Sequence, residues 1–123
     1  MRAALIAAAA LLALPAASHA ADAAAGEAAF KGDLACAACH VPGEYDQAPP
    51  LAGVYGRKIA GAPNWPYCEA LTARGAKGEV WDDKSLDAFL ADTQAFAPGC
   101  AMTYKIDDGA KRADVIAYLK TLK

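Results

Sequence analysis

The sequence predicts an all-α fold of four short helices joined by loops. Three stretches carry apolar residues at the three- to four-residue spacing typical of the buried face of a helix: Gly26, Phe30 and Leu34; Leu86, Phe89 and Leu90; and Val115, Ile116, Leu119 and Leu122. No segment after residue 20 shows the pattern of a strand. The elements are therefore expected to be helices and ordered loops alone.

The first 20 residues have the features of a secretory signal peptide. Arg2 supplies a positive charge, a short apolar run follows, and Ser18 and Ala20 form a small-x-small end, so cleavage is expected after Ala20 or Ala21. The apolar run is short for a membrane span, although an uncleaved anchor is the alternative. Residues 21–123 are expected to form one exported domain, whose net charge moves from -2 to about -3 without Arg2.

A first helix is expected from Asp22 to Ala35, and it leads directly into the C-x-x-C-H motif of residues 36–40. In this motif Cys36 and Cys39 add to the two vinyl groups of a porphyrin, and His40 binds its iron. A thioredoxin-like redox pair, half of a zinc site and a short-range disulfide are the alternatives. The helical approach does not suit a redox pair, and no second ligand pair has zinc spacing, so the motif favours covalent haem attachment.

Residues 41–66 are rich in Pro and Gly, yet apolar residues such as Leu51 and Ile59 are interleaved with them. This mixture indicates an ordered loop that wraps a ligand. A short helix over residues 67–74 is expected to follow, with Pro66 in its first turn and Gly75 as its stop.

The last two helices each follow an aspartate pair that can supply the N-cap. They are expected over residues 84–92, after Asp82 and Asp83, and over residues 110–122, after Asp107 and Asp108.

Met102 follows a turn at Pro98 and Gly99, a position that suits a ligand better than a core methionine. Once residues 1–20 are removed, His40 and Met102 are the one histidine and the one methionine of the chain. A haem iron with His and Met ligands can therefore take only this pair. Iron bound on both faces has no open position, so the expected reaction is outer-sphere transfer of one electron, and the protein is not expected to be an enzyme.

The mature chain resembles a class I cytochrome c of the mitochondrial and bacterial cytochrome c2 type. The matching elements occur in the family's order: Gly26 with Phe30, residues 36–40, Pro49 with Leu51, residues 53–58, Tyr67, Trp81, Pro98 and Gly99 with Met102, and Arg112 followed by residues 114–119. The resemblance implies the class I fold wrapped around one covalently bound haem c.

The resemblance also implies roles for several residues around that haem. The Pro49 carbonyl would accept a hydrogen bond from the ring of His40, and Arg57, Tyr67 and Trp81 would bind the propionates. Taken singly, a loop stiffener is the alternative for Pro49, whereas a residue such as Arg57 is more often a surface charge and the two aromatic residues are more often part of the core. Gly26 and Phe30 match a helix crossing, which is a structural role.

Two departures from the family pattern affect the expected site. The loop between His40 and Pro49 is shorter and the turn after Tyr67 is longer, so the surface below the haem should be remodelled. In addition, Cys68 and Cys100 replace small hydroxyl residues that lie near one propionate in the family. A disulfide between them is expected in an oxidising compartment, with two buried free thiols as the alternative.

These features together predict a soluble, monomeric electron carrier of the bacterial periplasm. The donor would be a bc1-type complex or an exported dehydrogenase, and the acceptor an oxidase or a reductase, with transient docking on membrane complexes and no nucleic acid. Because the chain is acidic and offers only Lys31, Lys58 and Lys105 as cationic contacts, the partner should not present a strongly acidic docking site. Two alternatives stay open: a dedicated haem subunit of an exported dehydrogenase, and a sensor in which Met102 dissociates.

Overall fold

A computed structural model describes residues 20–123, so the expected signal peptide lies outside the described residues except for its last position. The described chain contains five α-helices and one short 3-10 helix: α1 (Ala23–Lys31), η1 (Cys36–Ala38), α2 (Glu69–Ala76), α3 (Asp83–Ala91), α4 (Thr93–Phe96) and α5 (Gly109–Leu119). Within this part of the chain, extended pairing is limited to an isolated bridge between Lys58 and Val80. The all-α prediction is confirmed, with α4 as an additional helix.

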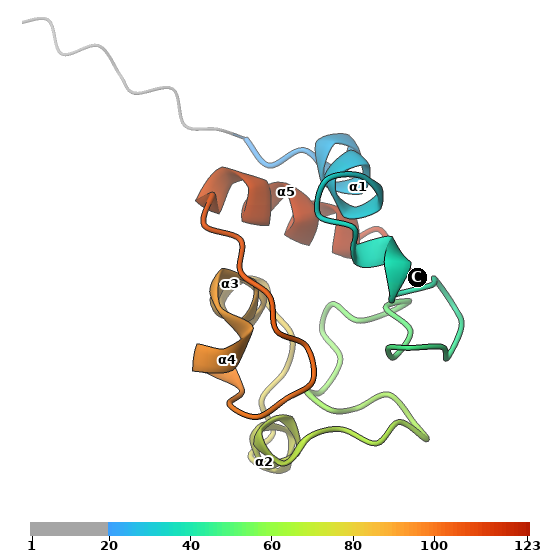
Figure 1. The fold of residues 1–123 in the computed structure, drawn as a ribbon, viewed down its shortest axis with the longest axis vertical. Helices are drawn as coiled ribbons and strands as arrows, with labels where there is room; N and C mark the ends of the chain where they lie inside the picture. Colours follow the sequence, from blue (N-terminus) through green and yellow to red (C-terminus); the bar gives the residue numbers. More distant parts are fainter. Residues whose placement is uncertain (1–19) are drawn as a thin grey trace, which may run out of the picture.

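The helices surround a central space that the loops complete. Helices α1 and α5 pack at one end of the molecule, α2 lies at the other end, and α3 and α4 lie between them (Figure 1). The long loop of residues 41–66 forms the remaining side (Figure 1). In residues 20–123 no helix has both the length and the apolar character needed to cross a membrane.

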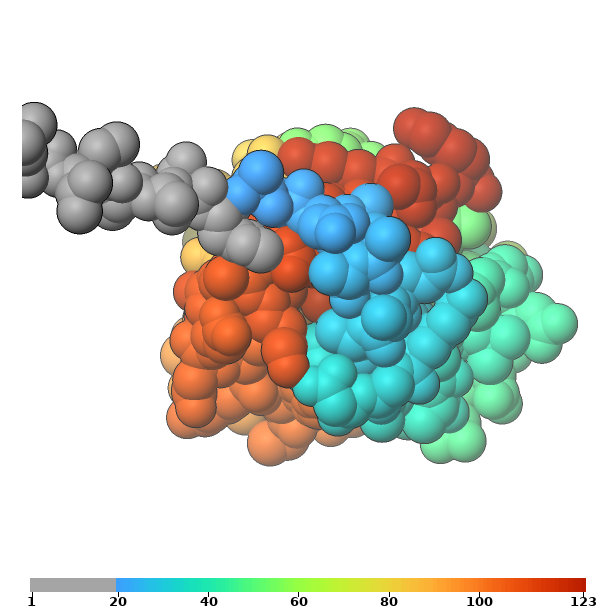
Figure 2. All heavy atoms as spheres, turned by 90° about the horizontal axis from the view of Figure 1, so that it is seen from above, coloured from blue at the N-terminus to red at the C-terminus, as the bar shows by residue number. Residues whose placement is uncertain are grey.

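Helices α1 and α5 cross in close contact, as the small residue at position 26 predicts. A Cβ atom on Gly26 would overlap the backbone carbonyl of Asp114, so any side chain here would separate the helices. The crossing is reinforced by an edge-on contact of Phe30 with Tyr118, whose ring centroids lie 5.3 Å apart, and by the Asp22 amide, which donates to the Asp114 carboxylate at 2.8 Å. Figure 2 shows the first helix lying directly against the last.

Aspartates cap three helices: Asp82 and Asp108 belong to the pairs that the sequence predicts as N-caps, whereas the cap at Asp22 was not predicted. The carboxylates of Asp22, Asp82 and Asp108 accept hydrogen bonds from amides in the first turns of α1, α3 and α5. Each of these helices ends earlier than expected. In α1 and α5, apolar residues at helical spacing continue past the last helical residue, but the chain that carries them is irregular. The clearest case is α1, which ends at Lys31 and not at Ala35.

The predicted helix over residues 67–74 is displaced. Helix α2 begins after Cys68, which is its N-cap residue, and it continues through Gly75 to Ala76. Gly75 does not stop the helix; a Cβ atom there would overlap the Ile59 carbonyl, so glycine allows the loop to cross the helix closely. The chain turns instead at Gly78, whose φ of 80° is favourable for glycine.

Candidate functional site

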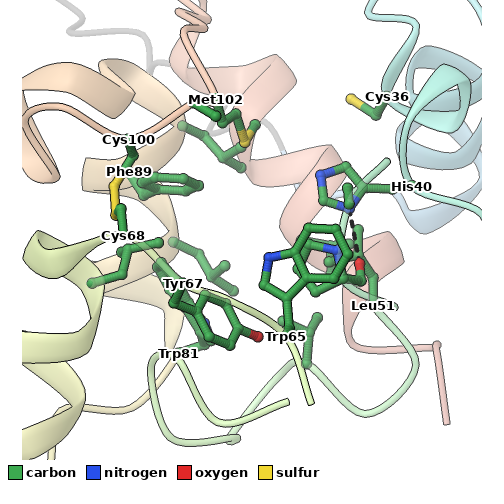
Figure 3. Close-up of a pocket in the computed structure, with 18 of the residues that line it drawn as sticks. Cys36, His40, Leu51, Trp65, Tyr67, Cys68, Trp81, Phe89, Cys100 and Met102 are labelled. Carbon is green, nitrogen blue, oxygen red and sulfur yellow. Dashed lines mark hydrogen bonds between the residues drawn. A yellow bond between two sulfur atoms is a disulfide. The ribbon is translucent and has the colours of Figure 1, made fainter. Parts of the chain in front are cut away.

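A cavity of about 440 Å³ brings together most of the residues that the sequence singled out, and its volume is typical of a site for a small molecule or cofactor. The predicted residues on its wall are Cys36, His40, Pro49, Arg57, Tyr67, Cys68, Trp81, Cys100 and Met102. The rest of the wall is mainly apolar and includes Phe30 of α1, Leu86 and Leu90 of α3, and Val115 and Leu119 of α5. The predicted residues therefore meet inside the hydrophobic core, although they come from distant parts of the sequence (Figure 3).

The C-x-x-C-H segment forms a tight turn at the edge of this cavity. Ala35 has a positive φ of 52°, so the chain changes direction just before the motif. The amides of Cys39 and His40 both donate to the Cys36 carbonyl, at 3.1 and 2.9 Å. Cys36 faces the cavity, and burial raises the pKa of its thiol. Cys39 is exposed and is not part of the wall; its Sγ lies 4.0 Å from Oε1 of Gln47, which is a wall residue. The Cys36 thiol thus lies on the cavity wall and the Cys39 thiol at its rim.

The ring of His40 is held by a single hydrogen bond. Its Nδ1 lies 3.1 Å from the Pro49 carbonyl oxygen, and because a carbonyl can only accept, Nδ1 carries the proton (Figure 3). Burial lowers the pKa of His40, and the hydrogen bond to Pro49 opposes this effect only in part. The neutral ring therefore keeps Nε2 as a free lone pair, which is the form of histidine that binds a metal.

Arg57 provides the test of whether the cavity suits an anionic group. Its two terminal nitrogens donate to the carbonyls of Ala52 and Pro50, at 3.3 and 3.1 Å. Its Nε is buried and has no partner among the described residues. A buried N–H that lacks an acceptor is costly, and a carboxylate in the cavity would satisfy it. The donor set of Arg57 therefore fits a haem propionate.

Tyr67 and Trp81 lie on the same wall as Arg57. The Tyr67 hydroxyl oxygen accepts a hydrogen bond from the Ala62 amide at 3.2 Å, which leaves its own proton to be donated. The backbone of Trp81 donates to the Arg57 carbonyl at 2.9 Å, so these two residues are fixed side by side. The Trp81 ring is 7% exposed and stacks on Phe96 with a centroid separation of 5.8 Å.

Met102 reaches the cavity from the loop between α4 and α5. A disulfide anchors this loop two residues before Met102, where Cys100 is joined to Cys68 with a Cα–Cα distance of 5.3 Å. The bridge connects the loop to the N-cap position of α2. Figure 3 shows the disulfide on the wall next to Met102, with His40 entering from another segment.

Two residues of this region were missed by sequence reasoning. Trp65 lines the cavity and stacks on Tyr45 at a centroid separation of 6.3 Å, which joins the segment between His40 and Pro49 to the chain just before Tyr67. A tryptophan within a Pro- and Gly-rich loop is a signal that could have been used. Gln94 of α4 makes three hydrogen bonds to the Met102 loop, and nothing in the sequence pattern distinguishes it from a surface glutamine.

Comparison with known proteins finds a matching family model and relatives that align with most of this chain. The family model for cytochrome c matches residues 23–123. The chain is 39% identical to a cytochrome c2 of Rhodopseudomonas palustris over 116 residues, which cover 83% of this chain and 99% of the relative. It is 36% identical to a cytochrome c2 of Rhodospirillum rubrum over 110 residues, which cover 83% and 98%.

Solved structures agree with the sequence relatives. The structure of ferricytochrome c2 from Rhodopseudomonas palustris superposes with a TM-score of 0.74 at 36% identity, and covers 83% of this chain and 99% of that chain. The structure of cytochrome cH from Methylobacterium extorquens superposes with a TM-score of 0.72 at 41% identity, and covers 81% and 98%.

Proposed function

Because this chain belongs to the cytochrome c family, we propose that it carries single electrons between redox proteins of the bacterial periplasm. Members of the family carry one covalently bound c-type haem with iron, and they transfer electrons and do not catalyse a chemical conversion. The proposal adds the residues that hold the haem, the ligands of its iron, the location and the kind of partner.

The observation that carries the proposal is the neutral His40 ring in a cavity that Met102 also lines. Pro49 fixes the proton on Nδ1, so Nε2 keeps the lone pair with which His40 would bind the haem iron. The Met102 thioether, supplied by a different segment, would be the second iron ligand. Cys36 and Cys39 would form the two thioether bonds to the haem, and Cys39 is the more exposed of the two thiols.

The bound haem iron supplies a reversible one-electron couple between its ferrous and ferric states. The chain's residues tune this couple in one direction. Apolar walls disfavour the additional positive charge of the ferric state, and the soft Met102 sulfur favours the ferrous state, so both raise the reduction potential. Arg57 would donate its unpartnered Nε–H to a propionate, and the Tyr67 hydroxyl, which accepts from the Ala62 amide, has its own proton left to donate to a propionate. With His40 and Met102 both bound to the iron, small molecules would have no open coordination site.

Absorption spectra of the oxidised and reduced protein test the ligand set. We expect c-type haem bands together with the weak iron–sulfur charge-transfer band in the ferric protein, and loss of that band in the Met102→Ala variant. The same variant should bind carbon monoxide in the ferrous state, whereas the native protein should bind it slowly. Rapid carbon monoxide binding by the native protein at neutral pH would contradict the closed site and favour a sensor.

The charge distribution supports a partner without a strongly acidic docking site. Of the three lysines expected as contacts, Lys31 is paired with Glu27, and Lys105 is paired with Asp92 at 2.9 Å. Pairing reduces the positive potential that these lysines present to a partner. Electron-transfer rates with an acidic model partner should therefore change little with added salt. A steep decrease in the rate with salt would contradict this proposal.

A further inference from the structure

We propose that Gln94 is a positioning residue that holds Met102 at the iron. The inference rests on the proposed function, because it requires Met102 to be an axial ligand. Gln94 does not line the cavity and would not contact the haem. Its effect would be exerted through the backbone of the loop that carries Met102.

The side-chain amide of Gln94 makes three hydrogen bonds to that loop. Its Nε2 donates to the carbonyl of Cys100 at 2.9 Å and to the carbonyl of Met102 at 3.0 Å. Its Oε1 accepts from the amide of Gly99 at 3.1 Å. One side chain thus contacts the loop backbone at Gly99 in the turn, at Cys100 and at Met102 itself. The disulfide, in comparison, is attached to the loop at Cys100 alone.

Helix α4 holds Gln94 in the position from which it makes these bonds. Asp92 caps the helix by accepting from the Gln94 amide at 3.1 Å. Thr93 is fully buried and shares three hydrogen bonds with Tyr104: the Tyr104 amide donates to the Thr93 hydroxyl at 2.8 Å, and the amide and hydroxyl of Thr93 donate to the Tyr104 carbonyl at 3.1 and 3.2 Å. Asp92 is also paired with Lys105. The chain before Gln94 is therefore fastened to the chain after Met102, and the loop is closed at its base.

Glutamine has the chemistry that this position requires. The two carbonyls need N–H donors and the Gly99 amide needs an acceptor, and a primary amide offers both kinds of group on one planar head. Glutamate has the same shape and can still accept from Gly99, but it places a carboxylate oxygen against two carbonyl oxygens. A comparison of glutamate with alanine at this position therefore separates hydrogen bonding from packing.

The experiment uses the haem-loaded full chain and its variants Gln94→Glu and Gln94→Ala. Imidazole added to the ferric protein competes with Met102, and the binding rate reports how often the methionine leaves the iron. Loss of two hydrogen bonds of about 1 kcal/mol each should raise this rate about 10- to 30-fold in Gln94→Glu. We expect Gln94→Glu to be at least as fast as Gln94→Ala. Amide hydrogen exchange over residues 99–102 should accelerate in parallel.

A matched control removes the effect of general destabilisation. Ile116 is 5% exposed, lies in α5 and does not line the cavity. The Ile116→Val variant should lower the stability of the protein without changing the imidazole rate.

The outcomes distinguish this inference from the proposed function. A native ferric spectrum without the iron–sulfur band would refute Met102 ligation and the role of Gln94 with it. If the native protein has the band but Gln94→Glu binds imidazole and exchanges amides at native rates, the role of Gln94 alone is refuted. A rate increase in Gln94→Ala without one in Gln94→Glu would show that packing and not hydrogen bonding holds the loop, and would also overturn the inference.

Discussion

The disulfide between Cys68 and Cys100 should contribute a large part of the stability of this small domain. It links residues separated by 32 positions, and for a loop of this length the chain-entropy model gives about 3 to 4 kcal/mol. Domains of this size are stable by about 5 to 15 kcal/mol, so the predicted contribution is a substantial fraction. The perturbation is the double variant Cys68→Ser/Cys100→Ser, which removes the covalent link with little change in side-chain volume.

Guanidinium chloride unfolding of the ferric haem-loaded protein, followed by circular dichroism, measures the effect. With a typical slope for a protein of this size, a loss of about 3 to 4 kcal/mol should lower the unfolding midpoint by roughly 1 M. The iron–sulfur band should be lost before the helices unfold, and the interval between the two transitions should be wider in the variant, because the released loop carries Met102.

A thiol reductant provides the matched control. With both proteins held in the ferrous state, because thiols also reduce ferric haem, the reductant should lower the unfolding midpoint of the native chain toward that of the double variant and leave the midpoint of the variant unchanged, since thioether bonds to haem are not reducible in this way. An equal midpoint for native and variant proteins would refute the stabilising role of the bridge. The same holds for mass spectra showing both cysteines as free thiols in the exported native protein.

Three other positions give defined expectations. Gly26→Ala should reduce the free energy of unfolding by about 1–3 kcal/mol, measured by denaturant titration, because the new methyl group overlaps the Asp114 carbonyl. Arg57→Leu should lower the reduction potential measured by voltammetry, because a positive charge that favours the ferrous state is removed. Lys105→Met should raise the pKa of Asp92 toward its ordinary value, measured by NMR of the ferrous protein, since the hydrogen bond from Lys105 is the largest cause that lowers it. In the native chain the stabilisation from Asp92 should be present above about pH 4 and lost as the pH falls through its lowered pKa, because the unfolded chain binds the proton more readily.

Local signals predicted the starts of helices better than their ends. An aspartate cap is decided by hydrogen bonds within three residues, so the pairs that contain Asp82 and Asp108 could be recognised from sequence. The end of a helix depends on what crosses it. Gly75 has the residue type of a helix stop, yet the close approach of the Ile59 carbonyl gives it a different role, and that approach is a tertiary property.

The same distinction applies to the candidate site. The residues of the C-x-x-C-H motif are adjacent in sequence, so the motif could be recognised directly. The other predicted residues on the cavity wall are far apart in the sequence, and the resemblance to the family identified most of them. Gln94 and Trp65 lie outside both kinds of signal. Their positions depend on how α4 meets the Met102 loop and on how the ring of Trp65 packs on Tyr45, which lies earlier in the same Pro- and Gly-rich loop. Contacts of this kind become visible only when the fold is known.

The two proposed axial ligands are held by different classes of contact, and this difference has a physical consequence. His40 is fixed by residues from Cys36 to Pro49, a short segment that would also be bonded covalently to the haem. Met102 depends on contacts with Gln94 and, through Cys100, with Cys68, which require the packed fold. Partial loosening of the protein should therefore release the methionine while the histidine remains. The contacts that hold the Met102 loop would thus be the ones that keep the iron closed to other ligands and restrict it to electron transfer.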